Sequence, residues 1–144
     1  MKKLTRKTLK ELEAEISQAL IRFEKEFMGR GPLETRTYVL EDMVLVRLKG
    51  VLTQTEMKLA EASDRQRGRY LLKQVRQELL DHGRPVLESI IRDILGVEIR
   101  SLHTDISTKT GERIIVLSLE HKPACVEANR RGEAQPGNGR PAAN

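Results

Sequence analysis

The sequence predicts an α+β domain in which helices pack on one face of a four-stranded antiparallel sheet. Two long segments repeat apolar residues every three or four positions, which is the period of an amphipathic helix. In two other segments, β-branched and other apolar residues recur at every second position, which is typical of the strands of a β-hairpin. The order is helix, hairpin, short helix, long helix, hairpin, and antiparallel pairing suits it. We expect one domain over residues 1–120 of the 144.

The first helix is predicted over residues 5–28. Thr8 and Glu11 have capping-box spacing, although Thr5 is an equally good cap. "GRGP", residues 29–32, then ends the helix, because glycine adopts the left-handed C-cap conformation and proline cannot continue a helix. The apolar stripe consists of Leu9, Leu12, Ile16, Leu20, Phe23 and Phe27.

Residues 34–49 are predicted to form the first hairpin. Its turn is short and lacks glycine, so Asp42 is expected to take a positive φ. The second strand, 43–49, is apolar on both faces. It is therefore expected to be central in the sheet or covered by a partner chain.

Two helices are predicted next. The short one begins at Thr53, which has capping-box spacing to Glu56, and the long one runs from a cap at Ser63 to Gly96. Pro85 either starts a new helix or bends a single one, and the unbroken stripe favours a single kinked helix. That stripe is Leu71 or Leu72, Val75, Leu79, Val86, Ile90 and Ile94.

The last ordered segment, 97–120, is predicted to be a second hairpin. Gly111 in the turn "TKTG" supplies a positive φ. The following residues, 121–144, are rich in Pro, Gly, Ala and Asn without a period, and we expect them to be disordered.

The charge disfavours nucleic acid as the partner. The net charge is +5, and the last 24 residues hold four basic and two acidic side chains, which leaves +3 for the rest. Nucleic-acid domains usually cluster their charge and add stacking aromatics. With no apolar run of ~20 residues and no apolar segment behind the basic N-terminus, the expected location is the cytoplasm. The single cysteine, Cys125, excludes an internal disulfide.

"SLHTDIS" contains Ser101, His103 and Asp105, which invites comparison with a catalytic triad. Residues two apart in a strand project from one face at ~7 Å, so Ser101 and His103 are not expected to reach hydrogen-bond distance. Working triads take their members from separate elements. His82 and His121 lack metal-ligand spacing to His103. We therefore expect no catalytic residues, no metal and no cofactor, and interpret His103 and Asp105 as a polar pair on a strand face or contact surface.

Two further motifs have competing interpretations. "GRGP" follows a helix, whereas phosphate loops precede one, so its role is mainly to end that helix. On the long helix, a basic row combines spacings of four and three. It is either a solvated face, which we favour, or a docking face for acidic protein, phosphate or anionic lipid. The row consists of Arg65, Arg69, Lys73 and Arg76.

Three blocks in order resemble the MpsC-like family over residues 5–120. They are "GRGP", "YVLEDMVLVRLKGVLTQTEMKLAE" and "SLHTDISTKTGERIIVLSLE". The family takes its name from a sodium-translocating, membrane-potential-generating system, and related genes accompany inorganic-carbon uptake. The resemblance brings no established catalytic residue. Turns and caps do not fully explain five family-like polar residues, which are the candidate interface or ligand surface: Arg30, Asp42, Arg47, His103 and Asp105.

The resemblance implies a soluble accessory or regulatory module of membrane cation or bicarbonate transport. Its expected partners are protein, including membrane transporter subunits, and a second copy in a homodimer through 43–49 or the long helix. It would work in the cytoplasm or at the inner face of the membrane. Two rival hypotheses remain: nucleic-acid or anion binding by the basic helix face, and a small-ligand sensor or enzyme that uses His103 and Asp105.

Overall fold

The computed structural model describes residues 7–62 and 64–126. The described residues form three helices and four strands, which confirms the α+β class and the predicted order of elements. In chain order these are α1 (Leu9–Met28), β1 (Glu34–Leu40), β2 (Met43–Lys49), α2 (Gln54–Ala60), α3 (Arg65–Leu95), β3 (Ile99–Ile106) and β4 (Arg113–Leu119).

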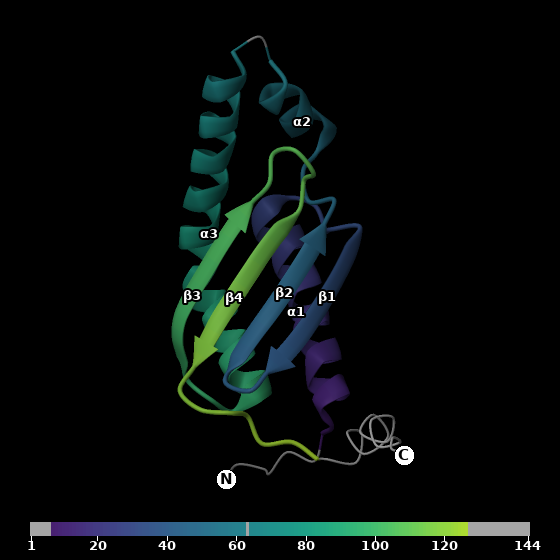
Figure 1. The fold of residues 1–144 in the computed structure, drawn as a ribbon, viewed down its shortest axis with the longest axis vertical. Coiled ribbons are helices and arrows are strands. Elements are labelled where there is room, and N and C mark those ends of the chain that lie inside the picture. Colours follow the sequence, from purple (N-terminus) through teal and green to yellow (C-terminus); the bar gives the residue numbers. More distant parts are fainter. Residues whose placement is uncertain (1–6, 63, 127–144) are drawn as a thin grey trace, which may run out of the picture.

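The four strands form one antiparallel sheet in the order β1-β2-β4-β3. Each hairpin supplies two neighbouring strands, and the pairing of β2 with β4 joins the hairpins. Figure 1 shows α1 and α3 behind this sheet, on one face, with α2 beyond its upper end. Strand β2 is therefore central. This was one of the two positions predicted for it, the other being a strand covered by a partner chain.

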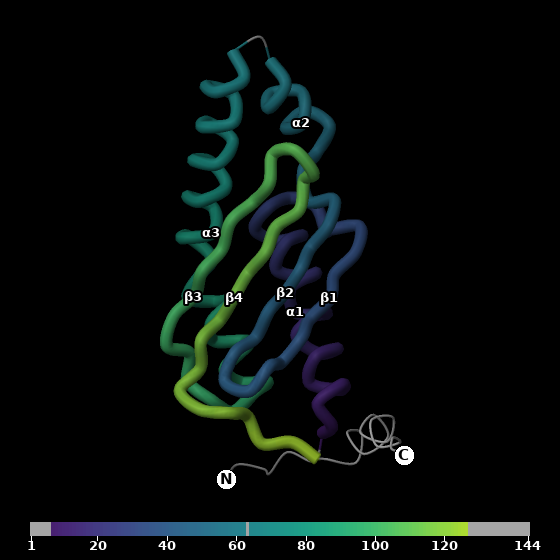
Figure 2. The backbone as a smooth tube through the Cα atoms, in the orientation of Figure 1, coloured from purple at the N-terminus to yellow at the C-terminus, as the bar shows by residue number. Residues whose placement is uncertain are grey.

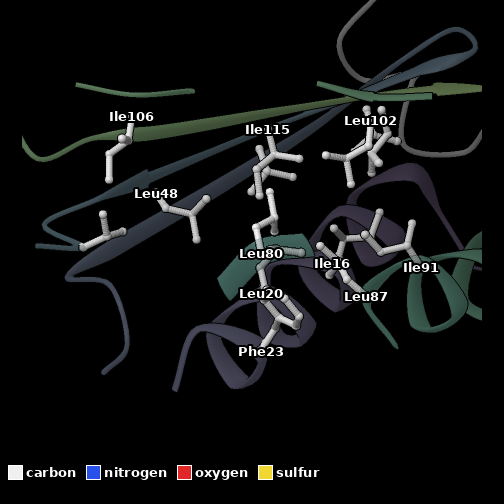
Figure 3. Close-up of a cluster of buried hydrophobic side chains, with 14 of the residues drawn as sticks. Ile16, Leu20, Phe23, Leu48, Leu80, Leu87, Ile91, Leu102, Ile106 and Ile115 are labelled. Atoms are coloured by element: carbon white, nitrogen blue, oxygen red, sulfur yellow. The ribbon is translucent and has the colours of Figure 1, made fainter. Parts of the chain in front are cut away.

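The core lies between the sheet and the two long helices (Figure 3). Alternate side chains of β2 and β4 point inward and meet apolar residues of α1 and α3, which removes them from water. The fully buried members include Ile16, Leu20, Val46, Leu48, Leu80, Leu87, Ile91, Ile115 and Leu117.

The helix ends and the first hairpin turn follow the predicted local chemistry, with one correction in the turn and one at the start of α3. Thr8 begins α1 and Thr53 begins α2, each with a complete capping box. In the β1–β2 turn, Glu41 adopts the positive φ, 58°, so the assignment to Asp42 was wrong by one residue. The N-cap of α3 is Asp64, whose side chain accepts from the Arg67 amide, while the predicted cap Ser63 lies outside the described residues.

Helix α3 runs through Pro85 without a break, which confirms the single helix. Its buried stripe, however, lies one residue further along than predicted, so that Val75 is 52% exposed. The true stripe includes Gly68 and Gly83, which carry no apolar side chain and lie against other elements. A Cβ at Gly83 would stand 2.8 Å from the Phe23 ring. The buried residues are Gly68, Leu72, Arg76, Leu80, Gly83, Leu87, Ile91 and Leu95.

The described part of the predicted tail, 121–126, packs against the domain. The Val126 amide donates to the Lys7 carbonyl at 3.0 Å, and Cys125 packs against the core. Figure 2 shows this segment crossing from β4 to the start of α1. The expectation of disorder from residue 121 is therefore wrong for these six residues, and the remaining tail lies outside the described residues.

Candidate functional site

One face of the sheet carries no helix within the described part of the chain, and we call it the open sheet face (Figure 1). It consists of the outward side chains of all four strands. Its apolar side chains are accessible to water, with Leu40 47% exposed beside the β1–β2 turn and Tyr38 40% exposed nearer the middle of the sheet. The apolar members are Tyr38, Leu40, Met43, Leu45, Ile114 and Val116.

Three of the predicted site residues lie on the open sheet face. Arg47, Ile114 and Asp105 are neighbours across β2, β4 and β3, and His103 lies two residues before Asp105. Because one strand separates Arg47 from Asp105, their Cα atoms lie about 10 Å apart, two strand spacings. Each charge instead has a nearer partner. The Arg47 guanidinium pairs with Glu112, and the Asp105 carboxylate accepts from Lys73 at 3.1 Å.

Ser101 and His103 are closer than expected. Ser101 Oγ lies 3.1 Å from His103 Nε2, so the expectation that they would not reach hydrogen-bond distance was wrong. A register shift between Ile99 and Ser101 interrupts regular pairing in this strand. The Asp105 carboxylate bonds to Lys73 and to the Ile106 amide rather than to the imidazole. The described residues therefore do not complete a triad, because no carboxylate orients the histidine.

Arg30 and Asp42 lie apart from this face and from each other. Arg30 Nη1 donates to the Leu52 carbonyl at 3.2 Å, which ties the end of α1 to the loop after β2. Asp42 is exposed in the β1–β2 turn at the other end of the sheet, where its carbonyl accepts from the Leu119 amide. The five predicted residues therefore do not form one cluster.

The predicted basic face of α3 loses one member. Arg65, Arg69 and Lys73 are exposed, whereas Arg76 is only 2% exposed. Three residues turn an α-helix by about 300°, which places Arg76 in the buried row with Leu72. The inclusion of Arg76 in an exposed docking face was therefore wrong.

Arg76 instead belongs to a buried charge cluster, which contains Glu24, Glu56, Arg76 and Arg113. The Arg76 guanidinium donates to the Glu56 carboxylate from Nε at 3.1 Å and from Nη2 at 2.7 Å. Nη2 also donates to the Val51 carbonyl. Glu24 is fully buried between the two arginines, 3.7 Å from Arg76 Nη1 and from Arg113 Nε. The cluster thereby joins α1, α2, α3 and β4.

Burial and pairing shift the pKa values of the cluster in opposite directions. Burial raises the pKa of Glu24, although both arginines oppose this. Burial also lowers the pKa of Arg113, against the attraction of Glu24. For Glu56 burial favours protonation, but hydrogen bonds from Arg76 and Thr53 outweigh it and lower the pKa. On the open face, the Lys73 hydrogen bond lowers the pKa of Asp105.

The sequence contained a usable indication of this cluster. Glu24 stands four residues after the core residue Leu20, and Arg113 alternates with Ile115 and Leu117. A charged residue at a position that the period assigns to the core needs a buried partner. Glu24 and Arg113 were missed because each stripe was judged by its apolar members alone.

Among residues 7–62 and 64–126, no group of three or more His, Cys, Asp or Glu side chains could hold a metal ion. None of the described helices combines the length and the apolar character needed to cross a bilayer.

The comparisons with known proteins agree with the resemblance found in the sequence. The family described as "Na+-translocating membrane potential-generating system (MpsC)" matches residues 8–121. The "Uncharacterized protein YbcI" of Bacillus subtilis (strain 168) is 40% identical over 108 residues, which cover 75% of this chain and 85% of the relative. No solved structure matches. The chain belongs to the MpsC family.

Proposed function

We propose that this chain is an accessory component of a membrane cation or inorganic-carbon transport system, and that its open sheet face docks a subunit of that system. The family description supports the link to a membrane system. The open sheet face is the observation that carries the docking role. We place the chain in the cytoplasm, at the inner face of the membrane.

The composition of the open sheet face fits a docking surface. Stable interfaces combine an apolar, aromatic centre with a polar rim. Here Tyr38, Leu45 and Val116 are register neighbours across three strands at the centre. Charged residues border them, with Arg36 and Arg47 on one side. Because β2 and β4 are both central, a partner reaches these side chains from above the sheet rather than by adding a strand at its edge.

Paired substitutions test this assignment. Leu40 and Met43 are cross-strand partners on the open sheet face, and both are exposed, so Leu40→Lys with Met43→Lys should leave the domain folded. Val75→Lys with Val86→Lys is the matched control, because it places two lysines on exposed valines of α3. Each variant replaces the native chain in cells that carry the transport system, and crosslinked membranes are then analysed.

The open-face variant should lose its crosslinks to a subunit with several membrane-spanning helices, while the α3 control keeps them. Loss from the α3 variant alone would assign docking to the helix and overturn the proposal. Native mass measurements provide the second criterion. If the open-face variant abolishes only a homodimer and no membrane subunit is recovered with the native chain, the face serves self-association and the proposed docking is wrong.

A further inference from the structure

A cavity of about 320 Å³ lies between the first half of α3 and the adjoining ends of β3 and β4. It is separate from the apolar centre of the open sheet face. Its volume falls at the small end of ligand sites. Three of the lining side chains are basic and one is acidic. The lining includes Tyr70, Lys73, Arg76, Thr104, Asp105 and Arg113.

Arg113 is the unusual member of this lining, because it is buried without a full set of partners. It is 2% exposed. Its Nη1 donates to Thr104 Oγ1 at 3.0 Å, and its Nε lies 3.7 Å from Glu24, beyond hydrogen-bond distance. Among the described residues, Nη2 has no hydrogen-bond partner. A guanidinium carries five N–H donors, and leaving charged donors unpaired in a buried site is costly.

The neighbouring charges do not satisfy Arg113. The carboxylate of Glu56 is held by both Nε and Nη2 of Arg76. Glu24 is shared between the two arginines and makes no hydrogen bond to either within the described chain. Arg113 lines the cavity, and an acceptor oxygen there completes its bonding once the side chain turns to present Nη2, because almost none of the Nη2 surface is accessible in this structure.

The rim of the cavity indicates the size and charge of a suitable occupant. Lys73 and Asp105 pair there at 3.1 Å, and both are substantially exposed. An oxyanion bound to Arg113 could also accept from Lys73 by displacing Asp105. A long polyanion would meet the exposed Asp105 carboxylate along its path and be repelled. The site therefore suits a small free anion better than a nucleic acid.

We propose that this cavity binds a small oxyanion, of the carboxylate or phosphate class, between the Arg113 guanidinium and the Lys73 ammonium. A planar guanidinium fork and an ammonium are the donors that proteins use for both classes. The proposal is independent of docking at the open sheet face, and the test below needs no partner protein.

Titration of the full chain by NMR at fixed ionic strength tests the site. The probes are orthophosphate, sulfate, bicarbonate and malonate, with chloride as the balancing salt, so that the arms separate phosphate-like from carboxylate ligands. At least one probe should shift the Arg113 Nε–Hε and Ile106 amide signals with saturation at one equivalent site. The absence of saturable shifts with all four probes would overturn the proposal.

Variants at the rim keep the test meaningful even if changes to the buried Arg113 prevent folding. Lys73→Gln should weaken binding about tenfold or more, as expected for a lost charged hydrogen bond. Arg69→Gln removes the same charge one turn away, outside the lining, and should change affinity much less. Asp105→Asn removes the competing carboxylate and should strengthen binding.

If Lys73→Gln and Arg69→Gln weaken anion binding equally, the effect is one of general charge, and the proposed site is wrong. Weaker binding by Asp105→Asn would contradict the displacement step. Vesicles of phosphatidylglycerol form the last arm. Binding to these vesicles without binding of any free anion would assign the basic residues to a membrane surface and overturn the proposal.

Discussion

Replacing Arg76 with methionine tests the structural role of the buried charge cluster. Methionine keeps much of the length of the side chain but removes every guanidinium contact. Those contacts are the two hydrogen bonds to Glu56, the bond to the Val51 carbonyl at 2.9 Å and the approach to Glu24. The substitution therefore affects α1, the loop before α2 and α2 itself.

The expected loss of unfolding free energy follows from what remains buried. The carbonyl of fully buried Val51 loses its side-chain donor, which costs about 1–3 kcal/mol. Glu24, which is 0% exposed, loses one of its two neighbouring cations. The Glu56 side chain is 23% exposed and can regain water, which limits its share. Removing one partner of a buried ion pair typically costs about 3–5 kcal/mol, and we expect the same here.

Urea unfolding measures this loss. With an m-value of about 2 kcal/mol/M, the midpoint of Arg76→Met should fall by about 2 M. Arg69→Met on the exposed face of the same helix is the control and should change the free energy by no more than about 0.5 kcal/mol. In a double-mutant cycle with Glu56→Gln, the coupling should be at least about 1 kcal/mol. A midpoint shift below about 0.5 M for Arg76→Met would refute the assigned role.

Three further outcomes follow from the described contacts. Because burial holds the pKa of Glu24 above its ordinary 4.5, wild-type stability should fall relative to Glu24→Gln as pH rises from 4 to 7, measured by urea unfolding at each pH. Gly68→Ala should cost at least about 2 kcal/mol, since its Cβ would stand 2.1 Å from the Leu59 carbonyl oxygen and force α2 from α3. Thr53→Ala removes the cap that accepts from the Glu56 amide and should cost about 1 kcal/mol in thermal unfolding.

Each of these outcomes has a control. If the stability of the wild type stays constant or rises relative to Glu24→Gln as the pH increases, the pKa of Glu24 in the folded state is not raised. Arg69→Ala, at the next position of α3, should be nearly neutral, and a similar effect for Gly68→Ala would contradict the close approach to α2. Thr55→Ala makes the same chemical change inside α2, and equal losses at Thr53 and Thr55 would deny the special role of the cap.

Local sequence patterns predicted most of the fold because they are set by local physics. Capping boxes, glycine C-caps and strand alternation each act within a few residues, and these features of α1, α2 and the hairpins were correct. The error in the α3 stripe has a different origin. Gly68 and Gly83 are buried because another element needs the space above them, which no hydropathy pattern records.

The candidate site was less predictable because it depends on which strands become neighbours. The sequence of β2 indicated an apolar outward face. The pairing of β2 with β4, however, placed Arg47 beside Ile114 rather than beside Asp105, and the Asp105 carboxylate accepts a hydrogen bond from Lys73 instead. Arg76 appeared to continue a basic surface row, since spacing alone does not say which side of a helix is covered. The side of α3 that is buried is determined by its packing against elements distant in the sequence.

Photo-crosslinking from the open sheet face tests the central claim most directly. A photoreactive phenylalanine analogue replaces Met43 in one chain and Val75 in another, and both chains are irradiated in cells that carry the membrane transport system. Both positions are exposed, on the open sheet face and on α3 respectively. The account predicts a crosslinked polytopic membrane subunit from position 43 and not from position 75. The same subunit crosslinked only from position 75 would contradict it.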